Sequence, residues 1–239
     1  MQGTSGAPPL AARACAWGGT LLFVASLSYF LYAYVVTFGE TPSSGTPGAG
    51  AVAFNVFLFT AFALHHSVFA RERIRTRVAR VVPPALERSV YVWIASVLFL
   101  FVCALWQPVP GIAWIATGPL RWLLVALQAA GIWLILRSAF MLDVLELSGV
   151  RQLSSTPRAA VFKTSGPYGW IRHPIYAGWF LLVLCAPGMT MTRLVFAAVS
   201  SAYLLVAIPF EERSLLATAG NAYREYVQQV RWKLIPGLY

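Results

Sequence analysis

Charged residues are scarce in this sequence. Asp, Glu, Lys and Arg together make up 11% of the 239 residues, and only 8 residues are acidic, whereas 59% are hydrophobic. A chain of this composition holds far more apolar surface than a soluble domain can bury, which excludes a soluble globular protein. The composition therefore indicates an integral membrane protein.

Cysteines are few, and glycine-rich motifs are sparse. The three cysteines, Cys15, Cys103 and Cys185, lie in separate apolar runs without CxxC spacing, which favours small buried side chains over disulfides or metal ligands. The GAG at 48–50 is too isolated to be a dinucleotide-binding fingerprint. We find no internal repeat and no segment typical of a separate soluble domain.

Long apolar runs are abundant. Crossing the hydrocarbon core as a helix takes about 20 residues, and in lipid every backbone N–H and C=O must be paired within its own segment. The fifth apolar run is short and ends at Pro187-Gly188, which predicts a tight reversal into the sixth. We therefore expect an all-α, polytopic transmembrane bundle of about six spans, with the last two forming a helical hairpin. The six candidate spans are 15–38, 51–70, 89–106, 119–142, 175–188 and 191–210.

The distribution of Lys and Arg predicts the orientation. With the N-terminus inside, all but Arg121 and Arg193 of the 18 Lys and Arg residues fall on the inner side, a strong positive-inside pattern. This topology and the attraction of anionic membrane lipid explain the net charge of +10 without a nucleic-acid partner. We expect a multi-pass protein of the cell (inner) membrane with both termini cytoplasmic, a tail at 1–14 and one transmembrane domain at 15–239.

Polar motifs gather in the last third of the chain. They read GPYGWIRHPIYAG at 166–178, PFEERSLL at 209–216 and GNAYREYVQQVRWKLIP at 220–236. Polar residues at a membrane boundary often only anchor helix ends. Anchoring a helix end does not explain the adjacent carboxylates Glu211 and Glu212. They repel each other near lipid unless a cation lies beside them. Arg172, Arg224 or the ammonium group of a ligand could supply that charge.

These motifs, in this order, resemble the membrane methyltransferases that include isoprenylcysteine carboxyl methyltransferases and phosphatidylethanolamine methyltransferases. The stretch FALHHSVFARERIRTRVARVVPPALERSVYVWIASVLFLFVCALWQPVP, with SGVRQL and PGMTMTRLVFA, is similar to the methanethiol S-methyltransferase branch. The resemblance covers roughly 54–236, and its motif-bearing part is 160–239. The chain has His65 where that branch has Gln, and Asp143-Val144-Leu145-Glu146 where we expect an Asn-His-Phe-Asp type of segment, so a second histidine is missing.

The resemblance implies methyl transfer from S-adenosylmethionine without a Rossmann domain. This cofactor presents a carboxylate, an ammonium, an adenine and a sulfonium, and the motif segments contain side chains suited to each. Gly178 would allow close approach of a ligand to the backbone, or equally a close contact between helices. By resemblance, Arg172 lies near the reacting methyl group and the cofactor pocket is lined by Tyr168, His173, Tyr176, Gly178, Glu211 and Glu212.

The methyl acceptor stays open among three classes, namely a small thiol, the carboxylate of an isoprenylated cysteine and a phospholipid amine. A thiol must lose its proton, and His66 is the candidate base, being an imidazole near the inner end of a predicted span. The alternative is that His66 is simply hydrogen-bonded within the bundle or to lipid headgroups. We expect S-methylation of a small thiol, with Arg172 and His66 as catalytic residues.

Two non-enzymatic functions are also compatible with the composition. A haem or metal carrier could use His65, His66 and His173, but adjacent residues of a helix point about 100° apart and cannot readily share one metal. A transporter would usually show broken helices or repeated halves, and the sequence has neither. We therefore expect no metal site.

Overall fold

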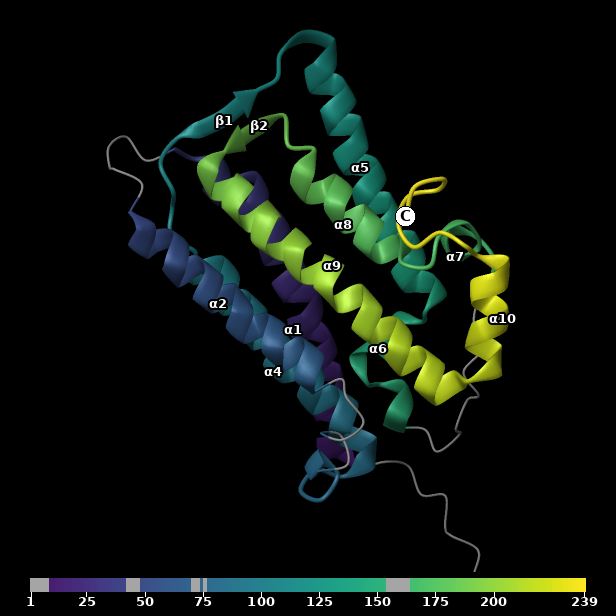
Figure 1. The fold of residues 1–239 in the computed structure, drawn as a ribbon. Helices are drawn as coiled ribbons and strands as arrows, with labels where there is room; N and C mark the ends of the chain where they lie inside the picture. The colour runs from purple at the N-terminus through teal and green to yellow at the C-terminus, as the bar shows by residue number, and fades with distance from the viewer. Residues whose placement is uncertain (1–8, 42–47, 70–73, 75–76, 154–163) are drawn as a thin grey trace, which may run out of the picture.

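Long apolar helices make up most of the structure, a computed structural model that describes residues 9–41, 48–69, 74, 77–153 and 164–239 (Figure 1). Within these described residues, five helices are long and apolar enough to cross a membrane, and at most 33% of the residues in their apolar windows are buried inside the protein. Their outer faces are thus available to lipid, as expected for a polytopic bundle. These helices are α1 (Leu10–Val35), α2 (Ala49–Val68), α4 (Pro84–Leu105), α5 (Gly118–Met141) and α9 (Met191–Ala219).

The predicted bundle is confirmed, with shifted boundaries. Of the tail predicted at 1–14, residues 1–8 lie outside the described residues, and α1 already begins at Leu10. The span predicted at 89–106 begins earlier, at Pro84, because a proline is well accommodated in the first turn of a helix. As a result, Arg88 belongs to a membrane helix and not to a loop.

The fifth predicted span is a short helix, α8 (Pro174–Leu184), of 11 residues. At 1.5 Å per residue it rises about 16 Å, well short of the ~30 Å hydrocarbon core. The chain then continues as strand β2 (Gly188–Thr190) and reverses into α9, which packs against α8. The predicted short hairpin is confirmed, although the run predicted at 175–188 is helical only as far as Leu184.

A two-stranded sheet closes one end of the bundle, a feature that the hydropathy pattern did not predict. Strand β1 (Ile112–Ile115), between α4 and α5, pairs antiparallel with β2, with Trp114 opposite Met189. Arg193, at the start of α9, donates its Nε–H to the Tyr34 carbonyl at 2.9 Å and so joins α1 to this end. The sheet and Arg193 therefore define the end of the bundle opposite to the polar motifs (Figure 1).

Aromatic side chains form the core between α1, α2, α4, α8 and α9. Phe196 of α9 is fully buried and lies 5.3 Å, centroid to centroid, from Phe30 of α1. Trp179 of α8 also stacks on Phe30, at 4.8 Å, and lies 6.1 Å from Phe196, so the three rings contact one another. Offset aromatic pairs contribute about 0.5–1.5 kcal/mol each beyond their buried area, so this cluster fixes α8 and α9 relative to α1.

The segment after α9 returns to the start of α8. Helix α10 (Asn221–Gln229) buries Tyr223 and Tyr226, and the chain beyond it folds back toward α7 (Pro167–Trp170), as Figure 1 shows. The backbone N–H groups of Arg172 and His173 donate to the carbonyls of Trp232 and Lys233, both at 2.9 Å. Main-chain hydrogen bonds thereby join the polar motif at 166–178 to the one at 220–236, beside the motif at 209–216.

Two short elements link α5 to the motif region. Helix α6 (Val144–Ser148) begins after Asp143, whose side chain accepts a hydrogen bond from the Leu145 N–H at 3.1 Å. A single turn follows at Arg151–Leu153, where the Arg151 Nε–H donates to Asp143 at 2.9 Å. A second short turn, Thr37–Gly39, follows α1. Residues 143–146, which differ from the segment expected from the resemblance, thus form the capped start of a short helix.

Candidate active site

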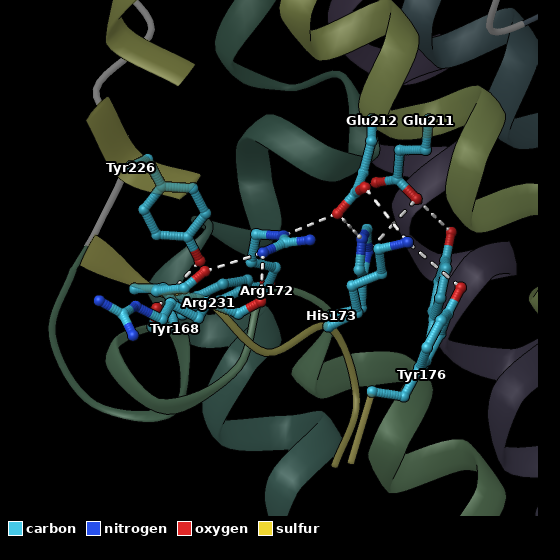
Figure 2. A network of polar contacts seen from close by, with 11 residues as sticks. Tyr168, Arg172, His173, Tyr176, Glu211, Glu212, Tyr226 and Arg231 are labelled. Carbon is cyan, nitrogen blue, oxygen red and sulfur yellow. Dashed lines mark hydrogen bonds and ion pairs between the residues drawn. The ribbon is translucent and has the colours of Figure 1, made fainter. Parts of the chain in front are cut away.

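Glu212 of α9 is surrounded by nitrogen-bearing side chains. Its Oε1 accepts a hydrogen bond from Arg172 Nε at 2.7 Å and lies 3.3 Å from His173 Nε2, and Lys233 Nζ is 3.8 Å from its Oε2 (Figure 2). Arg172 is therefore the cation that meets the carboxylate pair. Arg224, the other protein candidate, instead donates to the Asn221 side chain at 3.2 Å.

Arg172 also holds the returning C-terminal segment. Its Nη1 donates to the carbonyls of Val230, at 2.9 Å, and Arg231, at 2.7 Å, and its side chain is only 6% exposed. A planar guanidinium can satisfy several acceptors at once because its five N–H groups point in fixed directions. Arg172 thus ties together the start of α8, the inner part of α9 and the chain after α10.

Glu211, the neighbour of Glu212, has a different environment. Its Oε2 accepts a hydrogen bond from the Tyr176 hydroxyl at 2.6 Å and lies 3.8 Å from His173 Nδ1. His173 in turn stacks on Tyr176, with ring centroids 5.4 Å apart. The Glu211 side chain is 43% exposed, against 18% for Glu212. Glu211 is therefore the carboxylate that a bound molecule can reach.

Tyr168 lies behind this network, on α7. Its carbonyl accepts a hydrogen bond from the Tyr226 hydroxyl at 2.9 Å (Figure 2). Burial raises the pKa of Tyr226 to about 12, although the Arg172 guanidinium acts in the opposite direction. Burial likewise raises the pKa of Tyr168 well above its usual value, and Tyr226 and Glu211 act in the same direction. Both hydroxyls are therefore protonated at neutral pH.

Gly178 lies at a contact between helices. A Cβ atom at Gly178 would stand 2.6 Å from the Gly131 carbonyl oxygen of α5, and a Cβ at Gly131 would stand 2.6 Å from the Gly178 carbonyl oxygen. Such reciprocal close approach is typical of small residues where membrane helices cross. Of the two explanations that the sequence left open for Gly178, helix packing accounts for its surroundings.

A cavity of about 730 Å³ opens between α2, α4, α8 and α9. Its walls are mainly apolar, but His66 of α2 lies in it together with Tyr176 and Glu211. Arg172 is not among the described residues that line it. The other polar lining residues are Thr60, Ser67, Arg88, Tyr91, Tyr203 and Ser214.

Two of the three histidines contact the same tyrosine, Tyr91, and the third contacts Glu212. His66 is hydrogen-bonded to Tyr91 of α4, His173 contacts Glu212, and His65 is buried between the rings of Tyr91 and Phe69. Of these two neighbours on α2, His66 is the one that lines the cavity. Among the described residues, no three His, Cys, Asp or Glu side chains converge as metal ligands would.

Several polar residues of the cavity were not predicted. Tyr91 Oη lies 2.8 Å from His66 Nδ1, the Arg88 guanidinium carbon lies 5.0 Å from the centre of the Tyr91 ring, and Tyr203 Oη lies 3.0 Å from Ser67 Oγ. The sequence does contain a signal for the contact between Arg88 and Tyr91. Arg88 and Tyr91 are three positions apart, so they share a face once the helix is known to begin at Pro84.

The chain is similar to known methyltransferases. Residues 132–217 match the isoprenylcysteine carboxyl methyltransferase (ICMT) family. The chain is 37% identical to methanethiol S-methyltransferase 1 of Bradyrhizobium diazoefficiens, over 90% of this chain and 79% of that protein. It is 36% identical to the methanethiol S-methyltransferase of Mycobacterium tuberculosis, over 88% of this chain and 90% of that protein. No solved structure matches the chain.

Proposed function

Because the chain belongs to the family of membrane methyltransferases that contains these methanethiol S-methyltransferases, we propose that it methylates a small thiol with S-adenosylmethionine as the methyl donor. The observation that carries the proposal is the shared cavity. It brings the accessible carboxylate of Glu211 and the imidazole of His66 into one largely apolar chamber. A carboxylate suits the ammonium group of the donor, and an imidazole suits a thiol that must be deprotonated.

The residues of the cavity suit S-adenosylmethionine. A volume of about 730 Å³ lies within the usual range for small-molecule sites, roughly 300–1,000 Å³. Glu211 would hold the ammonium group, and the rings of Tyr176 and Tyr203 offer aromatic surface for the adenine. When bound, this group supplies a methyl carbon activated by the adjacent sulfonium. Glu212 is less suited to bind it, because Arg172, His173 and Lys233 already surround its carboxylate.

The chain's own residues would then prepare the thiol. A thiol with an ordinary pKa near 8.5 is only a few per cent ionised at neutral pH. His66 would accept its proton, and the Arg88 guanidinium on the same cavity wall would favour the thiolate over the thiol. The apolar walls exclude water, which favours a displacement in which opposite charges are neutralised. Alignment of thiolate and methyl carbon supplies much of the remaining rate enhancement.

We also propose that both termini face the cytoplasm, with the cofactor side of the cavity at the inner membrane surface. Glu211, Glu212 and Arg172 gather near one end of the bundle, and the β1–β2 sheet lies at the other (Figure 1). Six crossings, counting α8 with β2 as one, return the chain to the side on which it began. The inner side would then carry most of the Lys and Arg residues, as the positive-inside pattern requires.

A labelled-methyl transfer assay tests the proposed function. Purified protein and S-adenosylmethionine carrying a labelled methyl group are incubated in separate reactions with methanethiol, with an isoprenylated cysteine and with phosphatidylethanolamine. We expect label in the dimethyl sulfide fraction. Label only in the prenylcysteine ester or the phospholipid would replace the thiol with that acceptor and leave the methyltransferase assignment unchanged.

A further inference from the structure

Tyr91 makes two contacts with the same residue. Its hydroxyl oxygen lies 2.8 Å from Nδ1 of His66 and donates a hydrogen bond to the His66 carbonyl oxygen, 3.2 Å away. That carbonyl belongs to the last turn of α2, where helix carbonyls need a donor from outside the helix. The imidazole and the main chain of His66 are thus both bound by one side chain of α4.

The two contacts together decide where the imidazole proton lies. A tyrosine hydroxyl has a single proton and can otherwise only accept, and a carbonyl oxygen never donates. If the Tyr91 proton pointed at Nδ1, the hydroxyl and carbonyl oxygens would face each other at 3.2 Å with no proton between them, which is repulsive. Both contacts are favourable only when Tyr91 donates to the carbonyl and accepts from an Nδ1–H.

We infer that Tyr91 is a positioning residue that holds neutral His66 in the Nδ1–H tautomer and so leaves Nε2 as the nitrogen that takes the thiol proton. The hydrogen bond at one ring nitrogen sets the protonation of the other. No partner of His66 Nε2 occurs in the part of the chain that the structure describes, and the side chain lines the 730 Å³ cavity. The tautomer is inferred from the geometry alone. The statement that the proton comes from a thiol rests on the proposed function.

In the proposed reaction, His66 in this tautomer accepts the thiol proton while the sulfur displaces the donor at the methyl carbon. The S–H proton passes to His66 Nε2, which becomes an imidazolium with Nδ1–H still bound to Tyr91. The new S–CH₃ bond forms as the bond between the methyl carbon and the donor sulfonium breaks, and that electron pair stays on the donor sulfur. The imidazolium then returns its proton to water.

Ionisable groups face His66 from each helix around it. On its own helix the neighbour is His65, whose two ring nitrogens have no partner among the described residues. Among the described residues that line the cavity, the group with a permanent positive charge is Arg88. The groups on the other elements are Arg88 and Tyr91 of α4, Tyr176 of α8, and Tyr203 and Glu211 of α9.

Nitrogen NMR tests the tautomer directly. Protein labelled with ¹⁵N-histidine contains only three imidazoles, and His66→Ala identifies the signals of His66. We expect the wild type to show a protonated Nδ1 and an unprotonated Nε2 at neutral pH, and Tyr91→Phe to shift His66 toward the Nε2–H form. Tyr32→Phe, a change at a tyrosine with 57% exposure on α1, is the matched control and should leave the spectrum as it is.

Kinetics supply the second readout. Tyr91→Phe should slow thiol methylation at neutral pH by about 10-fold, part of the gain that a positioned base provides, and the deficit should shrink at alkaline pH where the thiolate forms unaided. A wild-type His66 in the Nε2–H form, or an unchanged tautomer and pH profile in Tyr91→Phe, would overturn the inference. If the Nδ1–H form is present but no thiol is methylated, the tautomer assignment stands and the thiol function fails.

Discussion

Arg172 and Glu212, 40 positions apart in the sequence, form an ion pair of 2.7 Å between the residue before the α8 cap and the inner part of α9. Both side chains are largely buried, at 6% and 18% exposure. Removing one partner of such a pair leaves an uncompensated charge, which costs more than the pair itself contributes. The pair therefore separates the two adjacent carboxylates of α9 into one that holds the fold, Glu212, and one that faces the cavity, Glu211.

The first prediction compares those carboxylates. Glu211→Gln should weaken the binding of S-adenosylhomocysteine about 10- to 100-fold, because a charged contact with the ammonium group becomes a neutral one, while the melting temperature stays close to that of the wild type. Glu212→Gln should instead lower the melting temperature. Isothermal titration and thermal unfolding in detergent measure the two effects. Equal loss of affinity in both variants without loss of stability would contradict the division of roles.

Arg172 gives a second prediction. Arg172→Lys keeps the charge but cannot reach Glu212 and two carbonyls together, so we expect destabilisation of about 2–4 kcal/mol, comparable to breaking a buried ion pair. The segment around Val230–Lys233 should then become sensitive to limited proteolysis. Arg231→Lys, a change at a residue whose carbonyl and not side chain takes part in this network, serves as the control. Normal stability with a large loss of turnover would mean that Arg172 acts on the reacting groups directly.

A third prediction concerns pH and His66. His66→Ala should slow methyl transfer to a small thiol at neutral pH by about 100-fold or more, the usual contribution of a general base. The rate should partly recover at alkaline pH, as the pH rises toward the pKa of the free thiol, because the thiolate then forms without a base. A carboxylate acceptor, already ionised at neutral pH, should show little change. Thiol transfer that is intact at every pH would remove His66 from the mechanism.

The contact between α5 and α8 is the subject of a fourth prediction. Gly131→Ala would place a methyl group 2.6 Å from the Gly178 carbonyl oxygen and 2.9 Å from the backbone nitrogen of Leu182, so the helices must separate. We expect destabilisation of about 1–3 kcal/mol, the usual cost of overpacking. Gly50→Ala, where the added methyl group meets nothing within 4 Å, is the matched control and should be neutral or slightly stabilising. Equal melting temperatures would show that the two helices do not pack this closely.

Topology provides the fifth prediction. In a variant without the three native cysteines, Ile115→Cys, in the sheet and 65% exposed, should react with an impermeant thiol reagent added to intact cells. Arg224→Cys, on α10, should react only after the membrane is opened. The opposite pattern would invert the proposed orientation.

The sequence alone determined the class of the molecule and the segments that carry its candidate site. Apolar runs predict membrane helices because in lipid each segment must pair its own backbone groups, which is a local requirement. The run RHPIYAG and the adjacent Glu211 and Glu212 were identifiable as a candidate site because charge is costly beside lipid wherever it occurs. The short fifth helix was also predictable, since Pro187-Gly188 limits it locally.

The tertiary structure alone decided which of these residues meet. Tyr91 is 25 positions from His66, and Glu211 is 35 positions from Tyr176. Whether such side chains touch depends on the rotation of each helix about its axis, and a shift of one residue turns a side chain by about 100°. Hydropathy does not specify that rotation when lipid and helix neighbours are equally apolar. The pairing of β1 with β2, the partner of His66 and the different surroundings of Glu211 and Glu212 were therefore set by helix packing.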